Sequence, residues 1–77
     1  SQHFFSHDHP ILTSQGFKSV DSSLSSRLYP DLEFAGDLQI GDTIYLKTGQ
    51  EKVRSIEVKE DSYYTTLYDL SLAKEHV

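Results

Sequence analysis

The sequence has no cysteine, methionine or tryptophan, and its basic residues are few. Without cysteine the chain can form neither a disulfide nor a thiolate metal site, and its redox compartment stays undetermined. Seven Lys and Arg face twelve Asp and Glu, for a net charge of −5. This charge disfavours nucleic-acid binding, because phosphate contacts require a basic surface. No apolar run exceeds four residues, far fewer than a membrane-spanning helix needs.

The 77 residues permit one small domain, which we take as 1–77. Its core must come from nine Phe and Tyr together with Ile, Leu and Val. So thin a core, with no disulfide to supplement it, is typical of a segment that relies on further polypeptide. We therefore expect at least one strand edge or apolar patch to be unpaired within the chain.

Short alternating segments predict an all-β fold with one short helix. Asp21 or Ser22 can cap that helix, and Pro30 stops it. Val53 falls out of the alternation of its strand, which indicates a bulge near the preceding turn. The expected elements are strands at 2–6, 17–20, 43–47, 51–59 and 63–72, a helix within 21–28, and a loop over 29–36.

Candidate functional residues stand near the two ends of the chain. In the last strand the alternation puts Tyr68, Leu70 and Leu72 on one side and Asp69 on the other. His76 follows Asp69 seven residues later. Near the start, Ser6 and His9 supply a hydroxyl and an imidazole at positions i and i+3. Pro10 favours an extended conformation for His9, at a strand end.

Four motifs resemble the Hint superfamily, which comprises inteins, bacterial intein-like domains and hedgehog autoprocessing domains. Ser6-x-x-His9 resembles the family's Thr-x-x-His element, with serine in place of threonine. The later strand resembles its hydrophobic-Tyr-Asp-Leu element with a spaced histidine. The four stand in the family's order across nearly the whole chain: Ser6-x-x-His9, the HPxxT run 9–13 with Gly16-Phe17-Lys18-Ser19, the LxxGD turn 38–42, and 67–70 with His76.

The resemblance implies a Hint-like horseshoe β fold and a domain that splices or cleaves its own backbone by an N-to-O or N-to-S acyl shift. No cofactor is implied. The family's nucleophile lies well upstream of Thr-x-x-His, and Ser1 is too close to Ser6 for that part. Its terminal His-Asn pair lies beyond the second histidine. The chain thus resembles a central fragment that supplies acid–base groups, with flanking or complementary segments of its own domain and host protein as partners.

The resemblance also assigns roles to four residues. His9 would polarise and protonate the scissile amide, and the Ser6 hydroxyl would help to hold the developing oxyanion. Asp69 would couple the steps, and His76 would assist cyclisation of a terminal asparagine. We therefore expect His9 and Asp69 to face a common cleft.

Other interpretations stay open. Each of the four residues could be an ordinary strand-end or surface group. His3, His7 and His9 share a parity and could hold zinc, although no second ligand pair follows them. The chain could also be a non-catalytic acidic β module of a larger assembly.

Overall fold

The computed structural model describes residues 2–61 and 66–74, and within them the chain is mostly β with one short helix. This confirms the predicted all-β class in its coarse form. The elements are β1 (Gln2–Ser6), β2 (Ile11–Thr13), β3 (Gly16–Ser19), α1 (Ser22–Leu28), β4 (Phe34–Asp37), β5 (Thr43–Leu46), β6 (Gly49–Asp61) and β7 (Thr66–Lys74).

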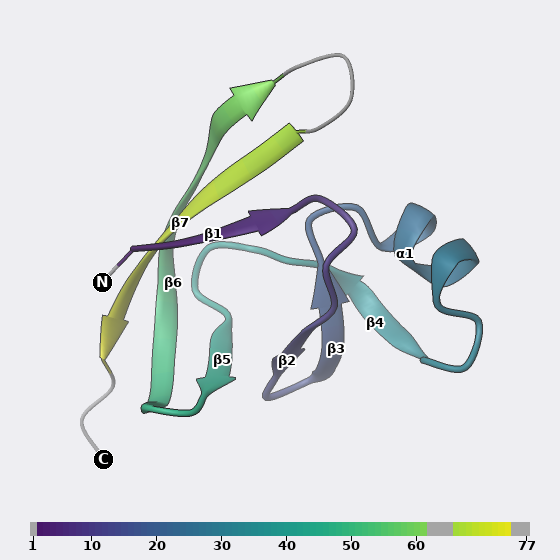
Figure 1. Cartoon of the computed structure of the whole chain (residues 1–77). Helices are drawn as coiled ribbons and strands as arrows, with labels where there is room; N and C mark the ends of the chain where they lie inside the picture. The colour runs from purple at the N-terminus through teal and green to yellow at the C-terminus, as the bar shows by residue number, and fades with distance from the viewer. Residues whose placement is uncertain (1, 62–65, 75–77) are drawn as a thin grey trace.

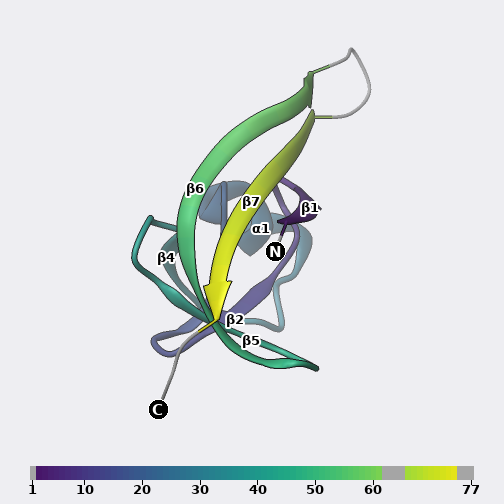
Figure 2. The same ribbon diagram turned by 90° about the vertical axis from the view of Figure 1, so that its left-hand side faces the viewer.

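The strands form one open mixed sheet in the order β1-β7-β6-β5-β2-β3-β4. Every pair is antiparallel except β3 with β4. β6 and β7 make a long curved ribbon, and α1 lies on the side of β3 and β4 (Figures 1 and 2). Within the described residues β1 and β4 are the edges of the sheet. An open edge of this kind was expected, and the pairing of β1 with β7 brings the two ends of the chain together.

The helix forms where the sequence predicts it. The Asp21 side chain accepts a hydrogen bond from the Leu24 amide at 3.1 Å, which caps the first turn, and the helix ends at Leu28, two residues before Pro30. It is seven residues long, and no described helix is long and apolar enough to span a membrane.

β4 corrects the predicted loop over 29–36. The segment shows no clear alternation, so local sequence gives no strand signal. It becomes a strand through tertiary pairing: β4 lies parallel to β3, and the Phe17 and Phe34 rings meet at a centroid distance of 6.4 Å. α1 makes this parallel pairing possible, because a parallel neighbour requires a crossover connection.

The predicted bulge is present in β6. The register against β7 shifts between Val53 and Ser55, so Arg54 is the extra residue. The shift lets Val53 face the core, where its side chain is 1% exposed. Sequence parity located this irregularity correctly.

The core lies on one face of the sheet and is small. Phe5, Leu46 and Ile56 pack against it from partly buried positions. The predicted alternation in β7 is confirmed, because Leu70 and Leu72 are both buried. The buried apolar residues are Ile11, Leu38, Ile44, Val53, Leu70 and Leu72.

Candidate functional site

The β1–β7 ladder joins the first and last sequence motifs. Phe4 lies directly opposite Asp69, and Ser6 lies opposite Leu67. Side chains of directly opposed residues point to the same face of an antiparallel pair. Ser6 and Asp69 therefore share one face as diagonal neighbours, with their Cα atoms roughly 7–8 Å apart. The structure thus brings these two predicted site residues together.

His9 is directed elsewhere. Its amide donates to the Ser6 carbonyl at 3.2 Å, which closes a tight turn after β1. Its exposed imidazole lies against the Phe5 ring, with the centroids 5.2 Å apart. Phe5 packs on the core, so it points to the face opposite Phe4 and Asp69. His9 and Asp69 consequently lie on opposite faces of the ladder, and the expected common cleft is not formed between them.

Asp69 occupies the middle of three strands. Its neighbours across the ladders are Phe4 on β1 and Glu57 on β6. Its side chain is partly buried, and the Oδ1 atom is shielded from solvent. The carboxylate is therefore held on a defined face between an aromatic ring and a second acid. His76, the fourth predicted residue, lies outside the described residues.

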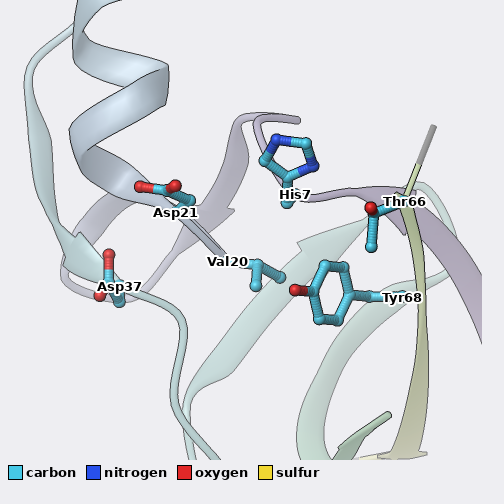
Figure 3. A pocket seen from close by; sticks show the side chains of 6 residues that line it. All are labelled: His7, Val20, Asp21, Asp37, Thr66 and Tyr68. Carbon is cyan, nitrogen blue, oxygen red and sulfur yellow. The ribbon is translucent and has the colours of Figure 1, made fainter. Parts of the chain in front are cut away.

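A hollow of about 360 Å³ opens beside the turn that carries the histidines. Asp21 and Asp37 stand on one side of it, Thr66 and Tyr68 stand on the other, and His7 and Val20 complete the lining (Figure 3). The His7 Nδ1 atom is buried and has no hydrogen-bond partner among the described residues. An imidazole, a phenol and two carboxylates could together receive a hydrogen-bond donor or a cationic group.

The sequence argument considered His7 only as a zinc ligand and missed this hollow. Its other lining residues lie far apart along the chain, so only the tertiary structure brings them to His7. The one local signal was the position of His7, directly after a strand and directly before the Asp-His-Pro turn.

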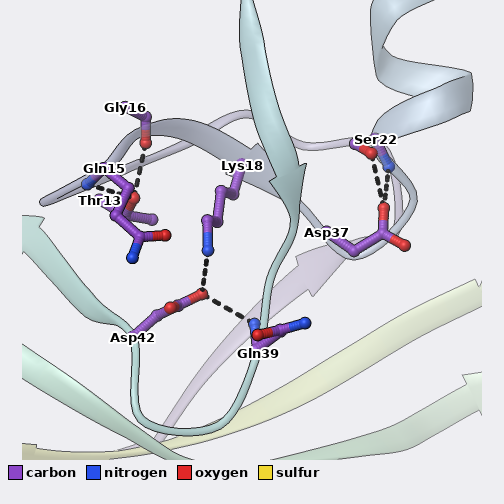
Figure 4. Close-up of polar contacts among 8 residues, drawn as sticks. All are labelled: Thr13, Gln15, Gly16, Lys18, Ser22, Asp37, Gln39 and Asp42. Carbon is purple, nitrogen blue, oxygen red and sulfur yellow. Dashed lines mark hydrogen bonds and ion pairs between the residues drawn. The ribbon is translucent and has the colours of Figure 1, made fainter.

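Asp37 keeps the rim of the hollow negative. Its Oδ1 atom accepts from the Ser22 hydroxyl at 2.6 Å and from the Ser22 amide at 2.8 Å (Figure 4). These two hydrogen bonds hold the pKa of the Asp37 carboxyl below its ordinary value of 3.8, and the bond from the hydroxyl has the larger effect. The group is therefore ionised at neutral pH.

Two of the sequence motifs bind each other. Asp42 of the LxxGD turn accepts from Lys18 of the glycine-aromatic run, with 3.0 Å between Nζ and Oδ2. The same oxygen accepts from the Gln39 amide at 2.8 Å (Figure 4). These motif residues therefore hold β3 against the turn before β5, a structural role.

The HPxxT motif closes a second turn. The Thr13 hydroxyl donates to the Gly16 carbonyl at 2.7 Å and accepts from the Gln15 amide at 3.1 Å (Figure 4). Gly16 has a φ of +113°, a conformation open to glycine at no steric cost. Thr13 and Gly16 together fix the β2–β3 hairpin that follows the histidine turn.

The position of the Phe5 ring argues against a zinc site formed by His3, His7 and His9. The Phe5 ring contacts both the His3 ring, at 6.3 Å between centroids, and the His9 ring, at 5.2 Å. The side chain of His7 lines the hollow instead. Across residues 2–61 and 66–74, no three His, Asp or Glu side chains gather as metal ligands.

Comparisons with known proteins found no match to this chain. No protein-family model matches the chain, and searches of the curated proteins and of the solved structures found no match. Functional inference therefore depends on the motifs and on the geometry of the described residues.

Proposed function

We propose that this chain is the central part of a Hint-type domain that splices or cleaves its own backbone. The observation that carries the proposal is the β1–β7 ladder, which places Ser6 and Asp69 on one face although they come from opposite ends of the chain. The order of the four motifs supports it, as does an open, mostly β sheet with one short helix. The fold would be the horseshoe of that superfamily.

His9 is the residue assigned to the first junction. The nucleophile is the side-chain hydroxyl or thiol of a residue in a flanking or complementary segment. It attacks the carbonyl carbon of the preceding residue, and the C–N bond between the two residues breaks. The exposed imidazole of His9, just beyond β1, accepts the proton of the nucleophile and then, as imidazolium, donates a proton to the departing amine. The resemblance assigns the Ser6 hydroxyl to the tetrahedral oxyanion, although Ser6 shares the face of Asp69 and not that of the His9 ring contacts. The result is an ester or thioester on the nucleophile.

Asp69 is assigned to a different step. It lies on the face opposite the ring contacts of His9. We assign Asp69 to the transfer that follows the acyl shift, with His76 assisting at the C-terminal junction.

A fusion protein tests the proposal. The chain is placed between an upstream segment that carries a Cys or Ser junction and a downstream segment that ends in His-Asn. Cleavage is followed by gel electrophoresis and intact mass. His9→Ala should slow cleavage at the first junction by about 10²- to 10⁴-fold, the usual cost of removing a general acid. Asp69→Ala should uncouple the two junctions and leave the first one active.

His3→Ala is the matched control, because the His3 ring also contacts the Phe5 ring but His3 belongs to none of the four motifs. It should cleave at the parent rate. If His9→Ala also does so, the Ser6-x-x-His9 assignment is wrong.

A second candidate is a non-catalytic acidic β module. The observation that favours it is the separation of His9 and Asp69 onto opposite faces of the ladder. On this alternative the wild-type fusion stays intact over the full course of the experiment, and both histidine variants behave like the parent.

A further inference from the structure

Ser25 is the buried serine of α1. Its side chain is 0% exposed, whereas Ser23 and Ser26 of the same helix are exposed. The Ser25 hydroxyl lies 2.6 Å from the Ser19 hydroxyl, 2.8 Å from the Asp8 carbonyl and 3.1 Å from the Asp21 carbonyl. A polar group buried this completely must be hydrogen-bonded, and these contacts provide its partners.

The Ser25 hydroxyl has a single proton, which limits it to one donated hydrogen bond. A serine hydroxyl donates one hydrogen bond and accepts up to two. If the Ser19 hydroxyl donates to Ser25, the Ser25 proton is free for the Asp8 carbonyl, its nearer carbonyl at 2.8 Å. The Asp21 carbonyl, four residues earlier, is the local partner that any helical serine can reach. The contacts with Asp8 and Ser19 are tertiary and shorter.

Asp8 belongs to the turn that carries the histidines. The adjacent carbonyl, that of His7, accepts from the Asp21 amide at 2.8 Å, and the His9 amide donates to Ser6. The N-cap residue of α1 and Ser25 in its middle thus hold two consecutive carbonyls of this turn. With those carbonyls fixed, the imidazole of His7 lines the hollow and that of His9 rests on Phe5.

We propose that Ser25 is a positioning residue: its buried hydroxyl fixes the turn formed by residues 6–9 and thereby aims the His9 imidazole. Its effect on a reaction rests on the function proposed above, whereas its effect on the turn does not. Removal of the hydroxyl leaves the Asp8 carbonyl and the Ser19 hydroxyl without their common partner. The turn then loses one of the two bonds that join it to α1.

The variants are Ser25→Ala, Ser25→Thr and the matched control Ser26→Ala. Alanine is a better helix former than serine, so α1 should persist in both alanine variants. NMR of the 77-residue chain reports on the turn. Ser25→Ala should weaken the nuclear Overhauser contact between the His9 and Phe5 rings and speed hydrogen exchange at the Asp21 amide. Ser26→Ala should change neither, and Ser25→Thr, which keeps a hydroxyl, should restore both.

The cleavage assay provides the functional readout. In the fusion protein Ser25→Ala should lower the first-junction rate by roughly 10- to 100-fold, since small misplacement of a catalytic group costs up to that much. Ser25→Thr should recover most of the rate. If Ser25→Ala does not fold, Ser19→Ala decides, because it removes the hydroxyl that lies 2.6 Å from that of Ser25 and should produce the same NMR changes to a smaller degree.

The outcomes separate the two proposals. A wild-type fusion that stays intact overturns the proposed function. The NMR contacts then still test whether Ser25 fixes the turn. A fusion that cleaves, together with unchanged contacts and rate in Ser25→Ala, overturns the positioning role alone. Unchanged ring contacts in a folded Ser19→Ala chain overturn it as well when Ser25→Ala fails to fold.

Discussion

Asp42 shows how one carboxylate can join two distant parts of the chain. Its Oδ2 atom accepts from both the Lys18 ammonium and the Gln39 amide. The ion pair is well shielded, with side-chain exposures of 7% for Lys18 and 12% for Asp42. A charge in such surroundings needs its partner, because an uncompensated buried ion is costly. Two motifs that carry the family resemblance in the sequence therefore also stabilise the fold.

Replacing Asp42 should reveal that cost. Asp42→Ala leaves the Lys18 ammonium buried and unpaired, so the free energy of unfolding should fall by about 3–5 kcal/mol. Lys18→Met in the same chain should recover part of the loss, since both charges are then gone. Urea denaturation measures these differences. Asp31→Ala, at an exposed carboxylate, is the control and should change stability by less than about 0.5 kcal/mol. Equal effects at positions 42 and 31 would refute the structural role of the ion pair.

The residues of the candidate site were predictable only where strand periodicity applied. The alternation through Tyr68, Leu70 and Leu72 correctly put Asp69 on the other face, and the alternation of Phe4 and Phe5 was likewise correct. Periodicity ends at the turn after Ser6. Beyond that point the direction of an imidazole depends on tertiary contacts, here the Phe5 ring for His9. This is why sequence alone could not place His9 relative to Asp69.

At the scale of elements, the register of β1 against β7 determines which groups can meet. Phe4 is opposed to Asp69, and a shift by one residue would move Phe5 to that position and carry Ser6 to the other face. The same ladder lets Phe5 pack on the core. The register therefore fixes both the apolar contact and the shared face of Ser6 and Asp69.

Paired cysteines can test this register without interference, because the natural chain contains none. Opposed residues of antiparallel strands have Cα atoms about 4.5–5.5 Å apart, within the range that a disulfide spans. Phe4→Cys with Asp69→Cys should therefore oxidise to an intramolecular disulfide. Phe5→Cys with Asp69→Cys should stay reduced, since those side chains leave opposite faces. Intact mass and thiol titration distinguish the two. Efficient crosslinking of the second pair, and not the first, would contradict the observed register.

Elements differ in how far local sequence determines them. The helix was predictable because Asp21 caps it and Pro30 follows its end. The bulge was predictable because Val53 departs from the alternation of apolar residues along β6. β4 carries no such signal. It exists because α1 returns the chain alongside β3, where Phe34 meets Phe17, and parallel pairing of this kind cannot be seen in a local window.

For the whole molecule, stability depends on a few buried side chains. The described core has six buried apolar residues, five of them from strands of the sheet and the sixth, Leu38, from the segment after β4. A domain of this size has little surplus stability, because it buries a smaller fraction of its surface than larger domains do. Leu70 and Leu72 come from β7, the strand that also carries Asp69. Core and candidate site therefore depend on one strand.

Leu70→Ala should accordingly have a large effect on the entire fold. Leu70 is 0% exposed, and truncation of a buried leucine costs about 2–5 kcal/mol. In a domain of this size each kcal/mol corresponds to roughly 4–8 °C in Tm, so the Tm measured by circular dichroism should fall by roughly 8–40 °C. Leu12→Ala makes the same chemical change at a side chain that is 44% exposed, and its shift should be a small fraction of that. If both variants melt together, the six-residue cluster does not carry the stability of the fold. In that case the face shared by Ser6 and Asp69 would have to be held by the β1–β7 ladder itself.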